Sequence, residues 1–154
     1  MTTSETWASP LFELRAQLQS ETELIGRAPE GIRTNLYVAG GEFSGRQLNG
    51  LLRRAGGDWF VLRQDGVGLL DVRCTLETSD GALIFGEHQG LLEFGENGYE
   101  AALRGERPES VRGGVTARYH TGDARYAWIN RCVCAGSIEV DLRRLEVSYR
   151  LFKL

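Results

Sequence analysis

Four side chains in this 154-residue sequence have the chemistry of an acid–base site: Asp71, Arg73, His88 and His120. Asp71 and Arg73 are two residues apart, so they project to the same face if this stretch is a strand. A carboxylate beside a guanidinium in a low-dielectric cavity can bind a polar substrate group or move a proton. A histidine titrates near neutrality and suits general acid–base catalysis.

The face that the strand turns inward decides whether Asp71 and Arg73 have such a role. Polar and apolar residues alternate along residues 69–78. The face opposite the charged pair carries four apolar residues, Leu70, Val72, Cys74 and Leu76. If the polar face is interior, the pair belongs to a site; if the apolar face is interior, the charged row is a solvated exterior. The sequence leaves both alternatives open.

The two histidines differ in their surroundings. His88 shares its face with Gly86 and Gly90, which would leave space for a ligand beside the imidazole ring. The alternative is a surface histidine beside flexible glycines. His120 ends an expected strand just before residues 121–123, which places it near a rim of the sheet.

These placements predict roles in a proton transfer. We expect His88 or His120 to transfer the proton and Arg73 to anchor a carboxylate or a developing oxyanion. Asp71 would orient Arg73 or a histidine.

Aromatic and amide side chains are the candidates for holding a substrate. Aromatic rings with polar tips can supply an apolar wall that still forms hydrogen bonds, although such rings at strand ends often serve plain packing. The predicted substrate-binding residues are Tyr37, Tyr126, Trp128 and Asn130.

Alternating patterns and turn signals predict the elements that position these residues. The Asp-Gly pairs at 65–66 and 80–81 are typical of tight hairpins. A helix of about a turn and a half at residues 99–104 would act as a lid, and a helix through Leu11, Leu14 and Leu18 is a weaker alternative to the first strand. The expected strands span residues 11–19, 32–43, 59–63, 67–78, 82–93, 115–120, 127–135 and 145–152.

The expected fold is therefore all-β, a single antiparallel up-and-down barrel of about eight or nine strands. No crossover helix separates the strands, which excludes a doubly wound parallel sheet. Closure into a barrel hides the sheet edges, and a sandwich is the alternative. Residues 11–154 would form this one domain, preceded by a disordered or extended segment at residues 1–10.

Charge and composition exclude several classes of partner. The chain has 18 basic and 21 acidic residues, and this balance does not favour nucleic acid. No apolar stretch is long enough to cross a membrane, and a secretion signal is absent, so we expect a cytoplasmic protein. The three cysteines do not have the spacing of a zinc site, and we expect neither metal nor cofactor. A homodimer is compatible with the sequence.

Six short motifs resemble the DUF3237 family of unknown function, also called UPF0311. They are GGEFSG (40–45), GDW (57–59), DGV (65–67), LDVR (70–73), TSDGALI (78–84) and TGDARYAWIN (121–130). The last is similar to the family's Thr-Gly-Asp-Pro-Arg-Tyr-Ala-Trp-Leu-Asn. The resemblance spans residues 11–152 and implies a small barrel similar to calycins and allene oxide cyclase. The chain departs from the family pattern at His88, His120 and Gly113-Gly114.

These observations favour a cofactor-free lyase, isomerase or cyclase acting on a small, partly aromatic metabolite in the barrel. A barrel that binds a small hydrophobic ligand without turnover is the alternative. A third hypothesis is a structural or partner-binding barrel, which requires an interior filled by side chains.

Overall fold

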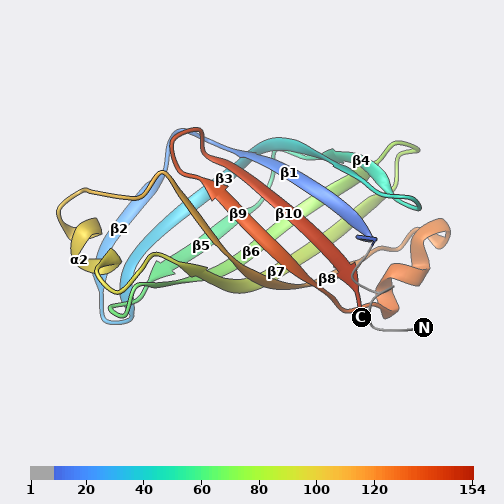
Figure 1. Cartoon of the computed structure of the whole chain (residues 1–154). Helices are drawn as coiled ribbons and strands as arrows, with labels where there is room; N and C mark the ends of the chain where they lie inside the picture. Colours follow the sequence, from blue (N-terminus) through green and yellow to red (C-terminus); the bar gives the residue numbers. More distant parts are fainter. Residues whose placement is uncertain (1–8) are drawn as a thin grey trace.

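Antiparallel strands close into a barrel in the computed structural model, which describes residues 9–154 (Figure 1). The strands are β1 (Phe12–Leu18), β2 (Glu23–Ala28), β3 (Gly31–Ser44), β4 (Asn49–Leu52), β5 (Gly57–Leu62), β6 (Val67–Thr78), β7 (Leu83–Glu93), β8 (Ser110–His120), β9 (Cys134–Asp141) and β10 (Glu146–Lys153). β1 pairs with both β10 and β3, which closes the sheet.

Two positions in the barrel wall are shared between short strands. β4 and β5 both lie between β3 and β6, one beside each half of these long strands. β1 and β2 likewise pair with successive parts of β3. The barrel therefore has eight strand positions, and the prediction of an all-β antiparallel barrel is confirmed, whereas a sandwich is excluded.

Most expected elements lie where the alternation predicts them. The strand predicted at residues 67–78 coincides with β6, and the predicted helix corresponds to α2 (Gly98–Leu103). β1 buries every second residue, so the strand and not the helix is correct there. The expected segment at residues 1–10 lies almost wholly outside the described residues.

The strand predicted at residues 127–135 is wrong over most of its length. Residues Ala124–Arg131 form a 3₁₀ helix, η1, and β9 begins only at Cys134. Asp123 starts the helix, since its carboxylate accepts a hydrogen bond from the Arg125 N–H at 2.9 Å. β4 lies in a stretch between two expected strands, residues 44–58, for which no element was predicted, and it closes the wall between β3 and β6.

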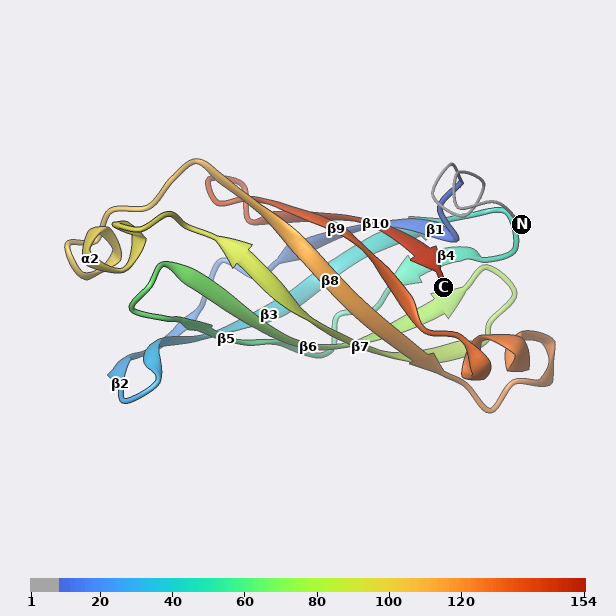
Figure 2. The same ribbon diagram turned by 60° about the horizontal axis from the view of Figure 1, so that its bottom comes forward.

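The two ends of the barrel are built differently, and Figure 2 shows η1 (orange) and α2 (yellow) at opposite ends. Ile129 of η1 is fully buried, and nearby rings pack edge to face, with Phe12 lying 5.3 Å from Tyr119 between ring centroids. Asp80 holds η1 in place by accepting the Tyr126 hydroxyl at 2.8 Å and pairing with Arg125 at 3.1 Å. The η1 end is therefore closed and filled.

Candidate functional site

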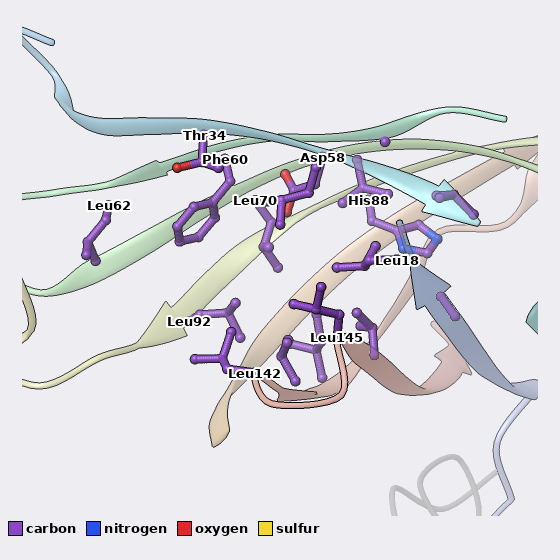
Figure 3. A pocket seen from close by; sticks show the side chains of 18 of the residues that line it. Leu18, Thr34, Asp58, Phe60, Leu62, Leu70, His88, Leu92, Leu142 and Leu145 are labelled. Carbon is purple, nitrogen blue, oxygen red and sulfur yellow. The ribbon is translucent and has the colours of Figure 1, made fainter. Parts of the chain in front are cut away.

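The barrel encloses a cavity of about 400 Å³ toward the α2 end (Figure 3). This volume lies in the range of about 300–1,000 Å³ that is usual for small-molecule sites. Most of the lining is apolar and dominated by leucine. The interior polar side chains are Thr34, Asp58, Cys74, His88 and Tyr149.

Strand register brings Asp58 and His88 to the same side of the cavity. Asp58 of β5 pairs with Val72 of β6, and Val72 pairs with His88 of β7. Residues directly opposite each other on neighbouring strands project to the same face. Two strand spacings place the Cα atoms of Asp58 and His88 about 10 Å apart, and Figure 3 shows both residues beside the cavity.

Asp58 is a half-buried carboxyl group that faces this apolar cavity. Burial raises its pKa from 3.8 to about 7, and the nearby charge of Asp71 acts in the same direction. The main-chain N–H of Asp71 donates a 2.9 Å hydrogen bond to Asp58 Oδ1, which opposes the rise without cancelling it. Asp58 is therefore present in both protonation states near neutral pH, as a general acid or base requires.

His88 is buried and held in place by two tyrosines. Its Nε2 lies 2.7 Å from the Tyr119 hydroxyl, and its ring packs edge to face on Tyr149 with centroids 4.7 Å apart. Its Nδ1 forms no hydrogen bond with any described residue. Burial lowers the pKa of His88 from 6.5 to about 4. His88 is thus a neutral imidazole at neutral pH, and its Nδ1 is buried without a partner among the described residues.

The Tyr119 hydroxyl is the hydrogen-bond partner that fixes the His88 ring. We expect Tyr119→Phe to lower the free energy of unfolding by about 1–3 kcal/mol, because it leaves Nε2 buried without a partner. Urea denaturation measures the change. Tyr37→Phe is the control, since the Tyr37 hydroxyl contacts Glu23 on the exterior, and an equal loss in both variants would contradict the role of Tyr119.

The space that the sequence predicts beside His88 is taken by protein. A Cβ atom added at Gly86 would lie 2.8 Å from Cys74 Sγ and 2.9 Å from the Tyr119 ring. Gly90 is equally crowded, by the main chain at Gly114. The glycines near His88 therefore admit the Tyr119 ring and a neighbouring strand, not a ligand.

This crowding predicts that Gly86→Ala lowers the free energy of unfolding by about 1–3 kcal/mol, as expected for overpacking of a filled core. Thermal denaturation measures the loss. Gly122→Ala is the matched control because a Cβ atom there has no neighbour within 4 Å. Equal melting temperatures for the two variants would contradict the prediction.

The interior face of β6 is the apolar one, which corrects the site predicted around Asp71 and Arg73. Leu70, Val72 and Cys74 are buried, whereas Asp71 and Arg73 lie outside and form an ion pair at 3.4 Å. A strand has only two faces, and closure of the barrel turns the apolar face inward. Neither Asp71 nor Arg73 contributes a side chain to the cavity.

The other predicted site residues are also away from the cavity, His88 excepted. His120 is exposed at the end of β8, and Tyr37 lies on β3 between the two cavity-lining residues Leu36 and Val38. Tyr126 and Trp128 belong to η1 and pack on the core at the closed end.

Asn130 has a structural role beside them. Its amide accepts a hydrogen bond from the Thr121 N–H and donates one to the Thr121 carbonyl, which ties η1 to the end of β8.

Sequence reasoning missed Asp58, Thr34 and Tyr149. The signal for Asp58 is present: in β5 it alternates with Phe60 and Leu62, both of which line the cavity. A single carboxyl on an otherwise apolar strand face indicates a buried acid. Tyr149 alternates with Val147 and other buried residues of β10 in the same way.

The described residues contain no cluster of three or more His, Cys, Asp or Glu side chains arranged to hold a metal ion. The three cysteines are buried thiols, and burial raises the pKa of Cys74 to about 12. Among residues 9–154, none of the helices is long and apolar enough to span a membrane.

Comparison with known proteins identifies relatives over nearly the whole chain. Residues 8–154 match the family described as "Protein of unknown function (DUF3237)". A UPF0311 protein of Rhodopseudomonas palustris is 28% identical over 141 residues, which cover 90% of this chain and 91% of that protein. A UPF0311 protein of Bradyrhizobium diazoefficiens is 26% identical over 140 residues, with 90% and 91% covered.

Solved structures share the fold. A β-barrel-like protein from Acinetobacter baumannii is similar with a TM-score of 0.79 and 27% identity, over 94% of this chain and 93% of that one. A protein described as an enzyme from Penicillium herquei is similar with a TM-score of 0.63 and 18% identity, over 95% and 96% of the two chains. At 18% identity, the second similarity concerns the fold alone.

Proposed function

The chain belongs to the DUF3237 family, also called UPF0311. For this member of the family we propose a cofactor-free enzyme of the lyase, isomerase or cyclase type. Its substrate would be a small, partly aromatic molecule held in the barrel cavity. The observation that carries the proposal is Asp58, a carboxyl group in an apolar cavity with a pKa of about 7.

Asp58 can supply both halves of a proton relay. In its neutral form the carboxyl group donates a proton to a substrate carbon or oxygen, and the carboxylate that results removes a proton from another substrate atom. The carboxyl group is regenerated and the substrate is rearranged without loss or gain of electrons. A positioned acid or base of this kind contributes a factor of about 10² to 10⁴ in rate.

His88 would border the reacting group as a neutral ring. Its Nδ1 has no partner among the described residues but is buried, so a substrate oxygen would have to displace neighbouring side chains to reach it. Nδ1–H would donate if Tyr119 donates to Nε2, and Nδ1 would accept if Nε2–H donates to Tyr119. Phe60 and Phe94 line the same cavity with ring centroids 5.8 Å apart. These rings support the expectation of a partly aromatic substrate.

The leucine-rich lining also favours a second function, binding of a small hydrophobic ligand without turnover. Such a protein needs the cavity but not the carboxyl group in it. The two functions are therefore separated by what Asp58 does to a bound molecule.

The test is turnover by the purified protein, without added cofactor, of a panel of enones, hydroxy acids and phenolic ethers followed by mass spectrometry and NMR. We expect conversion by the wild type and by His120→Gln, and conversion slower by a factor of about 10² to 10⁴ by Asp58→Asn. Rates should change with pH near 7, where Asp58 titrates. Conversion by Asp58→Asn at the wild-type rate would refute the mechanism, and binding without conversion would favour the second function.

Location and assembly are part of the same proposal. Three buried free thiols are compatible with a reducing cytoplasm. A homodimer would cover exposed apolar side chains such as Leu83 and Leu91 on the barrel exterior. Light scattering of the purified protein measures the assembly directly.

A further inference from the structure

We infer that the cavity selects uncharged, apolar molecules with a single oxygen function at the inner end, and rejects the corresponding anions. This inference names the substrate class of the proposed function and rests on it for the choice of site.

Among the described residues, none places a cation in the interior of the cavity. Its titratable groups are the Asp58 carboxyl, the Cys74 thiol, the His88 imidazole and the Tyr149 hydroxyl. Burial keeps the thiol, the imidazole and the hydroxyl uncharged near neutral pH. A carboxylate or phosphate ligand would lie unpaired in an apolar space beside an acid, and burial of an unpaired charge is strongly unfavourable.

Of the described residues that line the cavity, the one cation is Arg107, at the mouth. Arg107 and Glu106 follow α2 and are both exposed, with opposite charges side by side in sequence. Arg73, the predicted anchor for an anion, lies on the outside of β6. Neither arginine can pair with a ligand group that reaches Asp58.

The order of side chains along the strands gives the shape of the ligand. Leu62 and Leu92 lie four residues nearer the mouth than Asp58 and His88 on the same two strands. At about 3.3 Å per residue, this is about 13 Å of wall before Asp58 and His88, and it is apolar except for Thr34, which pairs with Phe60 halfway along. A ligand that fills the cavity therefore places its polar atom deep and its apolar body toward the mouth.

The side of the mouth that the turn between β9 and β10 forms is apolar. Leu145 has a φ of 56°, which is unusual for a branched side chain, and its carbonyl accepts the Leu18 N–H at 2.9 Å. This turn between β9 and β10 carries Leu142 and Leu145, which line the cavity (Figure 3). Leu24, exposed on β2, borders the same opening. An apolar molecule that enters the cavity therefore contacts leucine side chains first.

The test compares two probes of nearly equal shape, 2-acetylnaphthalene and 2-naphthoate, whose binding at pH 8 is measured by fluorescence and calorimetry. We expect the neutral ketone to bind at least tenfold more tightly than the carboxylate. Leu70→Trp, which fills the cavity, should weaken ketone binding, whereas Leu91→Trp on the exterior should not.

Several results would overturn the inference: equal or tighter binding of the carboxylate, binding of neither probe, or ketone binding that Leu70→Trp leaves unchanged. Turnover is a separate measurement. If the preference for the ketone holds while no substrate in the panel is converted, the proposed function fails and the substrate class stands.

Discussion

Replacing Asp58 with asparagine is expected to stabilise the protein by up to about 4 kcal/mol at pH 8 and to lower turnover by a factor of about 10² to 10⁴. The two effects have one cause. A carboxyl group placed in an apolar cavity is reactive near neutral pH because its ionised form is poorly solvated there, and poor solvation of the ionised form destabilises the folded protein.

The gain in stability should depend on pH in a defined direction. Asp58 has a pKa of about 7 in the folded protein and 3.8 as a free side chain. The folded state therefore binds the proton more tightly, and the stability of the wild type falls as pH rises from about 4 to 7. Asparagine cannot ionise, so the advantage of Asp58→Asn is absent at pH 3 and complete at pH 8.

Urea denaturation of both proteins at pH 3 and pH 8 measures this prediction. Asp65→Asn is the matched control, because Asp65 is exposed and its pKa is lowered by Arg63. That substitution should give no gain at pH 8. If Asp58→Asn is no more stable than the wild type at pH 8, Asp58 is not a poorly solvated acid and the proposed catalytic role loses its basis.

Replacing His88 with glutamine is expected to remove a pH dependence of the opposite sign, worth about 3 kcal/mol. The pKa of His88 falls from 6.5 to about 4 on folding. The unfolded chain therefore binds the proton more tightly between these values, and the contribution of His88 to stability rises with pH from about 4 to 6.5. In the wild type this rise opposes the fall caused by Asp58.

The measurement is the difference in unfolding free energy between wild type and His88→Gln. This difference should be about 3 kcal/mol larger at pH 7 than at pH 4. The control is His120→Gln, which alters an exposed histidine, and its unfolding free energy should change with pH as that of the wild type does. The double variant Asp58→Asn/His88→Gln should lack both contributions. A difference that does not change with pH would mean that His88 is solvated in the folded protein.

Much of the fold was predictable because turns and alternation are local. The Asp-Gly turns at 65–66 and 80–81 bound β6, whose limits the sequence predicts correctly. Strands without alternation were missed: β2 is exposed or half-buried along its length and pairs on one side only, and β4 has four residues. Their existence depends on the long strand β3 beside them.

The candidate site was less predictable, and β6 shows why. Period-two alternation sorts Asp71 and Arg73 onto one face and Leu70 and Val72 onto the other, but it does not say which face meets the interior. Closure of the barrel decides this, since the apolar face gains most by leaving water. The acid in the cavity then comes from a different strand, β5.

The sequence alone determined the all-β class, most strand limits and the family resemblance. It also identified His88 as a candidate site residue. The tertiary structure alone decides that Asp58 is the acid. The pKa of a carboxyl depends on what surrounds it, and Asp58 is surrounded by residues of β3, β6 and β10 that are distant in sequence. Local patterns place a side chain on a strand; its neighbours across the barrel give it its chemistry.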